Sequence, residues 1–159
     1  MSIQVDDKMP AGSFGVMTGD GPDSVSTDEL FSGKKVVLFA VTGAFTPTCS
    51  AKHLPGYVEK ADQLRDKVDE IWCLSVNDAF VMGAWGREHW ATGKVRMIAD
   101  CNGEITRALG LEMDASAFGL GKRSQRYAMV VEDGKVTHLA VEPGAGISVS
   151  AAEAILDVL

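Results

Sequence analysis

The sequence has little cysteine, no basic block and no long apolar run, and each absence excludes a class of protein. Its 3 cysteines form no C-x-x-C pair, which excludes a thioredoxin-type dithiol and a paired zinc motif. A net charge of -7 argues against nucleic-acid binding. No segment approaches the roughly 20 apolar residues of a transmembrane helix, so we expect no membrane partner.

The sequence also has no repeat, linker or low-complexity segment, and we expect no signal peptide. Residues 1–7 carry neither a positive region nor an apolar stretch, and low cysteine usage fits the reducing cytoplasm. His89 and His138 form no metal-ligand spacing with each other or with the cysteines, so we expect no metal and no cofactor. The length of 159 residues predicts a single domain, 1–159.

What the chain does have is a thiol between a predicted strand and a predicted helix. Residues 35–41 are nearly continuously apolar, as in a strand buried on both faces of a sheet. Thr46 is then the predicted N-cap of a helix and Pro47 its first residue, which places Cys49 at the third helical position. The partial positive charge of a helix start favours thiolate over thiol. We interpret Cys49 as a nucleophile; the alternative is a small buried hydrophobic residue, as most free cysteines are.

The segment 43–50 resembles the active-site loop of peroxiredoxins, specifically the type II group that includes peroxiredoxin five. Further segments resemble that group in order and spacing: residues 52–57, 73–81, 85–87, 94–96 and 126–131. The resemblance covers most of the chain from residue 35 onward. It implies a thioredoxin-like α/β fold with a central mixed sheet flanked by helices.

The resemblance implies a role for each residue of the loop. Cys49 attacks a peroxide and becomes a sulfenic acid, Thr46 hydrogen-bonds the sulfur and the peroxide, and Arg126 holds the thiolate and substrate oxygens. The chemistry supports these roles, because cleavage of an O–O bond develops negative charge that needs donors fixed beforehand. The N–H groups of Thr48 and Cys49 are further donors at the helix start, so we include Thr48 as a substrate-binding residue.

Three basic residues are candidates for the cation that holds the thiolate. The pattern of Lys122, Arg123 and Arg126 does not choose among them, and each has the alternative of a solvated surface charge. The resemblance of residues 126–131 to the family favours Arg126. An arginine keeps its proton at all working pH values, which makes it a steady partner for a thiolate.

One position departs from the family motif. The family has a proline four residues before the threonine, where this chain has Thr42. In the family the proline ring shields the cysteine from water and stiffens the loop. We therefore expect activity to persist in weakened form, with Cys49 easier to overoxidise.

The other cysteines decide how a sulfenic acid is recycled. Cys73 lies in an apolar run and is predicted to be a buried packing residue. Cys101 lies in a turn by composition, either as an accidental surface thiol or as an occasional disulfide partner. Peroxiredoxin five has a resolving cysteine where this chain has Val149. The resemblance thus implies a one-cysteine enzyme recycled by an external thiol, glutathione with glutaredoxin or thioredoxin.

Three functions remain open at this stage. The first is a thiol peroxidase that reduces hydrogen peroxide and small alkyl hydroperoxides. The second is a noncatalytic redox-responsive binding protein that kept the fold and lost turnover through Thr42 and the missing resolving cysteine. The third, a glutathione-dependent disulfide reductase, is disfavoured because Cys49 has no second thiol close by in the sequence.

Further patterns predict the remaining elements. Strands are expected at 71–76, 95–99, 127–132 and 135–141, the last two joined by an Asp133-Gly134 turn. Helices are expected from Cys49 toward residue 67 with a kink at Pro55, after Asp78 as cap, at 103–109, and after a capping box at 150–153. Residues 115–121 are expected to form a loop beside the site.

Aromatic residues near the loop are candidates for an interface. Enzymes of the resembling group dimerise through surfaces around the active-site loop, so we expect a homodimer. Phe45, Trp85 and Phe118 are its candidate residues, with core packing as the alternative, and Phe45 is favoured because its loop must be partly exposed. His53 is interpreted as a packing or hydrogen-bonding residue of the first helix.

Overall fold

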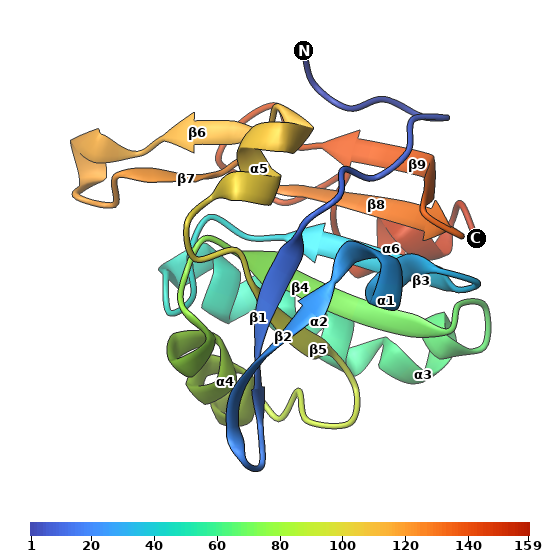
Figure 1. Ribbon diagram of the computed structural model, residues 1–159, viewed down its shortest axis with the longest axis horizontal. Coiled ribbons are helices and arrows are strands. Elements are labelled where there is room, and N and C mark those ends of the chain that lie inside the picture. The colour runs from blue at the N-terminus through green and yellow to red at the C-terminus, as the bar shows by residue number, and fades with distance from the viewer.

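The computed structural model describes residues 1–159 and contains one large mixed sheet with helices on both faces (Figure 1). Its strands follow the spatial order β2 (Gly21–Ser26), β1 (Ser13–Thr18), β5 (Arg96–Ala99), β4 (Glu70–Ser75), β3 (Lys35–Ala40), β8 (Tyr127–Glu132) and β9 (Lys135–Val141). The three central strands β5, β4 and β3 are parallel. Strands β1 and β8 pair antiparallel with β5 and β3, and β2 and β9 pair antiparallel with β1 and β8. This is the predicted thioredoxin-like α/β fold.

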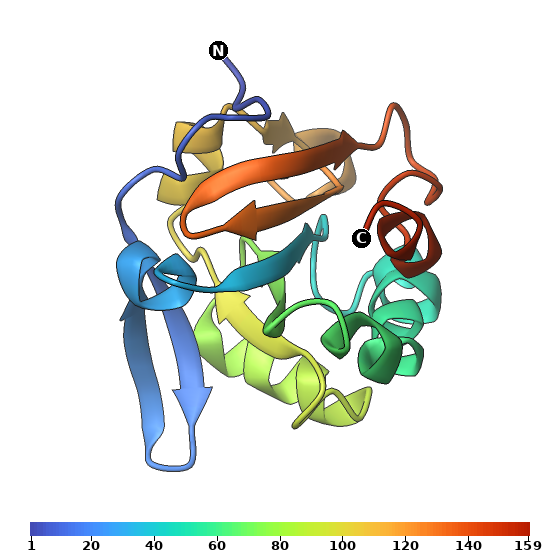
Figure 2. The same cartoon turned by 90° about the vertical axis from the view of Figure 1, so that its right-hand side faces the viewer.

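Each face of the sheet is covered by its own helices (Figure 2). One face packs against η1 (Cys49–His53, a π-helical turn), α2 (Leu54–Glu59), α3 (Ala61–Arg65), α4 (Ala79–Glu88) and α6 (Ala152–Leu156). The other face packs against α1 (Thr27–Phe31) and α5 (Glu104–Leu109). Because β3 and β4 are covered on both sides, their side chains are almost all buried, which explains their continuous apolar sequence.

The central elements lie where the sequence predicts them. Residues 133–134 form the tight turn between β8 and β9, with Asp133 at φ 49° and Gly134 at φ 82°, as a two-residue hairpin requires. The Asp78 side chain accepts a hydrogen bond from the N–H of Val81 and caps α4. Gly110 ends α5 in the left-handed conformation. Each of these local predictions is confirmed.

The predicted capping box at 150–153 is wrong. The last helix, α6, has Ala151 at its N-cap position and no side-chain cap. The hydroxyl of Ser150 donates to the carboxylate of Glu142 instead. Glu142, eight residues earlier, also accepts from the Ser150 N–H, which is the group that Glu153 would bond in a capping box.

Helix α1 is absent from the sequence predictions, and so are two small sheet features. One is the antiparallel pair β1–β2, which extends the sheet at one edge. The other is a separate two-stranded sheet of β6 (Glu112–Asp114) and β7 (Lys122–Ser124), which projects to one side in Figure 1. The residues between these strands form the predicted loop, with a single 3₁₀ turn η2 (Ser116–Phe118). None of the helices is both long and apolar enough to cross a bilayer.

Candidate active site

Cys49 lies just beyond the carboxyl end of β3, at the start of the first long helical segment. The helix begins at Pro47, and Cys49 is its third residue, as predicted. From Cys49 to His53 the backbone forms a π-helical turn, in which the N–H of Leu54 donates to the carbonyl of Cys49. Such turns are rare and occur often at functional sites. This turn directly precedes Pro55, which has no N–H to continue a regular ladder.

The loop before the helix is held by two polar contacts. The Thr46 hydroxyl donates to the Gly43 carbonyl at 2.7 Å, and the N–H of Ala44 donates to Asn77 Oδ1 at 3.0 Å. Thr46 stands at the predicted N-cap position, directly before the helix that begins at Pro47, but its hydroxyl bonds to the loop and to no N–H of the first turn. Its backbone carbonyl does accept from the N–H of Ser50. The N–H groups of Thr48 and Cys49 have no backbone acceptor, as expected for a helix start.

Arg126 reaches the thiol from the neighbouring strand. In the antiparallel pair of β3 and β8, Tyr127 lies opposite Ala40, so Arg126 lies one step further, where the loop to Cys49 begins. Its Nη2 donates to Cys49 Sγ at 3.2 Å, and the arginine is 8% exposed. The structure brings the predicted Cys49 and Arg126 into direct contact.

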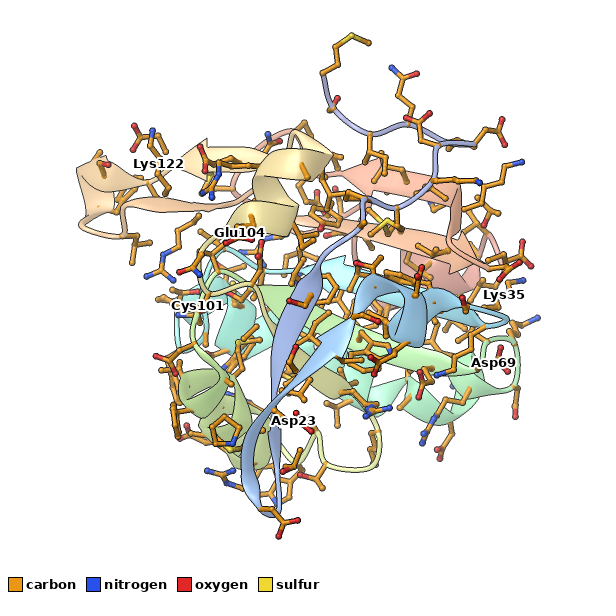
Figure 3. The ribbon with its side chains drawn as sticks, in the orientation of Figure 1. Asp23, Lys35, Asp69, Cys101, Glu104 and Lys122 are labelled. Atoms are coloured by element: carbon orange, nitrogen blue, oxygen red, sulfur yellow. The ribbon has the colours of Figure 1, made fainter.

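The two other cations of this segment have different partners. Arg123 donates from Nε to the Leu120 carbonyl and from Nη1 to the Val76 carbonyl, which ties the loop after η2 to the end of β4. Lys122 forms an exposed ion pair with Asp114, and Figure 3 shows it on the projecting β6–β7 sheet. Of the three cations, only Arg126 contacts the thiol.

His53 is a buried partner of Arg126. Its Nδ1 accepts from Arg126 Nη1 at 2.9 Å, and its Nε2 lies 3.1 Å from the Ser150 carbonyl. Arginine can only donate hydrogen bonds, so Nδ1 is unprotonated. Nε2 therefore carries the proton and donates a hydrogen bond to the Ser150 carbonyl. The ring packs against Phe39 and Tyr57, which stack on each other. Burial lowers the pKa of His53 to about 4, and the charge of Arg126 acts in the same direction.

A pocket of about 520 Å³ opens beside these residues. Thr42, Thr46, Thr48 and Arg126 belong to its polar wall, while Cys49 itself is fully buried and does not line the pocket. The apolar part of the lining consists of Pro47, Met113, Ala115, Phe118, Leu120, Pro143 and Ala145. No cluster of His, Cys, Asp or Glu side chains is arranged to hold a metal ion. The arrangement is a thiol at a helix start, one buried guanidinium and an entrance for a small polar molecule.

Comparison with known proteins assigns this arrangement to a family. The family model described as Redoxin matches residues 4–156. Peroxiredoxin-2B of Arabidopsis thaliana is 49% identical over 159 residues, which is 99% of this chain and 98% of the relative. The chain belongs to the peroxiredoxin family. The predicted membership of the peroxiredoxin family is thereby confirmed.

Solved peroxiredoxins share the fold of this one. Reduced Prx3 of Vibrio vulnificus, solved in complex with hydrogen peroxide, is 52% identical with a TM-score of 0.94, and 98% of each chain is covered. Peroxiredoxin 5 of Alvinella pompejana is 37% identical with a TM-score of 0.85, covering 97% of this chain and 96% of that one. The protein is therefore a thiol-dependent peroxidase, an oxidoreductase, and the comparisons favour this function over a noncatalytic binding protein.

The remaining cysteines of this peroxiredoxin differ in accessibility. Cys73 is fully buried in β4, and burial, with the nearby Cys49, raises its pKa well above the ordinary value. It stays a thiol and packs in the core, as predicted. Cys101 is exposed, in the turn that follows β5, and Figure 3 shows it near Glu104. None of the cysteines forms a disulfide.

The candidate interface residues also separate. Trp85 is fully buried, and its indole N–H donates to the Ser50 hydroxyl, so its place is in the core and the prediction of an interface role is wrong. Phe45 and Phe118 are exposed, at 51% and 83%. Phe45 also has a φ of 65°, a conformation that aromatic residues rarely adopt.

Sequence reasoning missed part of the polar environment of the site. Asn77 and Ser150 have partners 33 and 97 residues away in the chain, and the partners of Glu142, six and eight residues away, form no standard local motif with it. The one available signal concerns His53, which follows Cys49 by four residues and so belongs to the same side of the helix.

The buried neutral state of His53 has a consequence for stability. The unfolded chain binds a proton at His53 below its ordinary pKa of 6.5, whereas the folded chain does so only near 4. The free energy of unfolding therefore contains a contribution from neutral His53 that is fully present above pH 6.5. This contribution is lost as the pH falls toward 4, by about 3 kcal/mol in total. We expect urea unfolding at a series of pH values to show this loss. In His53→Gln, which keeps a donor and an acceptor but does not titrate, the fall should be smaller by that amount; equal curves would contradict the assignment.

Proposed function

We propose that Cys49 is the peroxidatic residue and that Arg126, Thr46 and Thr48 assist it. The thiolate attacks the outer oxygen of a hydroperoxide, an S–O bond forms and the O–O bond breaks. Cys49 becomes a sulfenic acid, and the departing oxygen takes a proton and leaves as water or an alcohol. The observation that carries this proposal is the 3.2 Å contact between Arg126 Nη2 and Cys49 Sγ in a buried site beside a pocket.

Each assisting group has free capacity in the resting site. Arg126 uses Nη1 for His53 and Nη2 for the sulfur, so its other N–H bonds remain for substrate oxygens. The Thr46 hydroxyl donates a hydrogen bond to the Gly43 carbonyl, so its oxygen is free to accept one from the O–H of the hydroperoxide. The unpaired N–H groups of Thr48 and Cys49 supply further positive charge where the oxygen departs.

We propose hydrogen peroxide and small alkyl hydroperoxides as substrates. The pocket beside Arg126 and Thr46 combines a polar wall with apolar side chains such as Met113 and Leu120, which fits a hydroperoxide with a short alkyl group. The relative from Vibrio vulnificus, which was solved with hydrogen peroxide, supports the smaller substrate.

An external thiol then reduces the sulfenic acid in two steps. The first thiol condenses with Cys49–SOH, forms a mixed disulfide and releases water, and a second thiol reduces that disulfide. Val149 stands where peroxiredoxin five has its resolving cysteine, and Cys73 is buried, which supports an external source. We propose glutathione with glutaredoxin, or thioredoxin, as the reductant, and the cytoplasm as the compartment.

The direct test is oxidation by one equivalent of hydrogen peroxide. Reduced protein is mixed in a stopped-flow instrument, and mass spectrometry locates the added oxygen. We expect Cys49 to be oxidised far faster than free cysteine, with Cys73 and Cys101 unchanged. Oxidation at the rate of free cysteine, or first at Cys101, would contradict the proposal.

Thr42 offers a second prediction at the same site. Thr42 lines the pocket beside Thr46, in the place where the family has proline. A proline ring excludes water from this wall and reduces the freedom of the loop. We expect Thr42→Pro to oxidise Cys49 a few times faster and to accumulate less sulfinic acid per turnover, measured by stopped-flow and mass spectrometry. Thr42→Ala is the control, since it removes the hydroxyl without adding the ring.

We also propose a homodimer formed through the surface around Phe45 and Phe118, whose side chains are 51% and 83% exposed. Aromatic side chains are enriched at the centres of interfaces. Phe118→Arg should shift the protein to monomer in sedimentation velocity. Trp90→Arg is the matched control, because Trp90 is 80% exposed at the end of α4. A dimer unaffected by Phe118→Arg would exclude this surface.

A further inference from the structure

The segment after β9 is tied to the active site through a buried carboxylate. Glu142 is 8% exposed and accepts from four groups: the N–H and hydroxyl of Ser148, at 2.8 and 3.0 Å, and the N–H and hydroxyl of Ser150, at 2.8 and 2.5 Å. Burial raises the pKa of Glu142, but these hydrogen bonds outweigh it and lower that pKa to about 2. Glu142 is therefore a carboxylate throughout the working range of the enzyme.

The carbonyl of Ser150 faces the opposite way, toward the helix of Cys49. It accepts from Tyr57 Oη at 2.7 Å and lies 3.1 Å from His53 Nε2. His53 in turn accepts from Arg126 at Nδ1. This carbonyl and the guanidinium of Arg126 therefore favour the same form of His53, which is protonated at Nε2 and accepts from Arg126 at Nδ1.

These contacts close into a ring. The N–H of Glu142 donates to the carbonyl of Arg126 at 2.9 Å, because β8 and β9 are paired at this point. The Glu142 carboxylate accepts from Ser150, the Ser150 carbonyl accepts from His53 Nε2, and His53 Nδ1 accepts from the guanidinium of Arg126. The ring therefore begins and ends on Arg126, once at its backbone and once at its side chain.

We propose that Glu142 is a positioning residue for peroxide reduction: through Ser150 it fixes the Nε2-protonated form of His53 and thereby the orientation of Arg126 toward Cys49. This inference rests on the proposed roles of Cys49 and Arg126. A guanidinium held at two nitrogens is oriented in its plane, which a single contact with sulfur does not achieve. With Val149 in place of a resolving cysteine, the segment has no need to unfold during the cycle and can serve as a fixed support.

Three variants distinguish the hydrogen bonds of the ring from the charge of Glu142 and from its contact with Ser148. Glu142→Ala removes every acceptor for Ser148 and Ser150. Glu142→Gln removes the charge, yet its carbonyl oxygen can keep the three donors of Oε2 while its amide donates to Ser148 Oγ. Ser148→Ala is the matched control, because it removes one contact of Glu142 and leaves Ser150 held.

The experiment combines kinetics with ¹⁵N NMR of the histidine rings in reduced, full-length protein. In the wild type His53 should show protonated Nε2 and unprotonated Nδ1, with His89 and His138 as internal references. We expect Glu142→Ala to mix the two neutral forms of His53 and to lower kcat/KM for hydrogen peroxide about tenfold. Glu142→Gln and Ser148→Ala should stay within about twofold and keep the wild-type His53 signals.

Other outcomes overturn the inference. Wild-type His53 signals and wild-type kinetics in folded Glu142→Ala would do so, as would an equal loss in Glu142→Gln, which would indicate a role for the charge alone. If Glu142→Ala does not fold, Ser150→Ala, which keeps the backbone contacts, must shift the His53 signals part of the way; unchanged signals again overturn it. A wild type whose Cys49 reacts no faster than free cysteine would instead overturn the proposed function, whatever the state of His53.

Discussion

Cys49→Ser should abolish peroxide reduction, with kcat/KM for hydrogen peroxide lowered by about 10⁴-fold or more. A serine hydroxyl of the same shape keeps the contact with Arg126 but is not ionised at neutral pH, so it cannot attack the O–O bond. Because the side chain at this position is fully buried, the variant still needs its hydroxyl paired, and Arg126 remains there to donate to it. We therefore expect a folded, inactive protein, measured by coupled peroxidase assay and circular dichroism.

The other cysteines provide the matched controls for this result. Cys101→Ser changes an exposed thiol and should leave both activity and stability unchanged. Cys73→Ala removes a buried sulfur from β4 and should lower stability by about 1–2 kcal/mol while keeping activity. Loss of activity in Cys101→Ser would show that Cys101 resolves the sulfenic acid. Residual activity in Cys49→Ser would show a second nucleophile.

The part of the fold that the sequence predicted is the part whose causes are local. Residues 35–40 and 71–75 are apolar because both faces of these strands are covered, and that requirement is visible in the sequence itself. The Asp133-Gly134 turn and the Asp78 cap depend on residues within a few positions of each other. Cys49 was found for the same reason, because the strand, the proline and the thiol are adjacent in the chain.

The contacts that sequence reasoning missed are those that no standard local motif describes. Ser150 and Glu153 have the spacing of a capping box, but Glu142 lies near enough in the fold to take the Ser150 hydroxyl. The residues of β2 are mostly polar and at least partly exposed, and β1 buries a single side chain, so an edge pair of this kind has no strong apolar pattern. The role of His53 depends on Arg126 and Ser150, which lie 73 and 97 residues away.

Arg126 is the other residue whose replacement should have a very large effect. We expect Arg126→Lys to lower kcat/KM for hydrogen peroxide by about 10²–10³-fold, the usual loss when one fixed donor to a developing negative charge is removed. Lysine keeps the charge but has a single nitrogen, which cannot lie 3.2 Å from Cys49 Sγ and 2.9 Å from His53 Nδ1 while also donating to the peroxide in a fixed plane. The measurement is the second-order rate of Cys49 oxidation by stopped-flow.

Lys122→Gln is the matched control for this variant, since it removes a cation from the same segment that pairs only with Asp114 at the surface. Its rate should equal that of the wild type within about twofold, because an exposed ion pair contributes little. The comparison also tests geometry against charge. If Arg126→Lys retains the wild-type rate, a positive charge alone is sufficient, and the fork of donors that joins Cys49 to His53 has no part in catalysis. If its rate falls as far as that of Arg126→Gln, the orientation of the guanidinium accounts for most of the rate enhancement. The hydrogen bonds through Glu142, Ser150 and His53 that fix this orientation then contribute to catalysis.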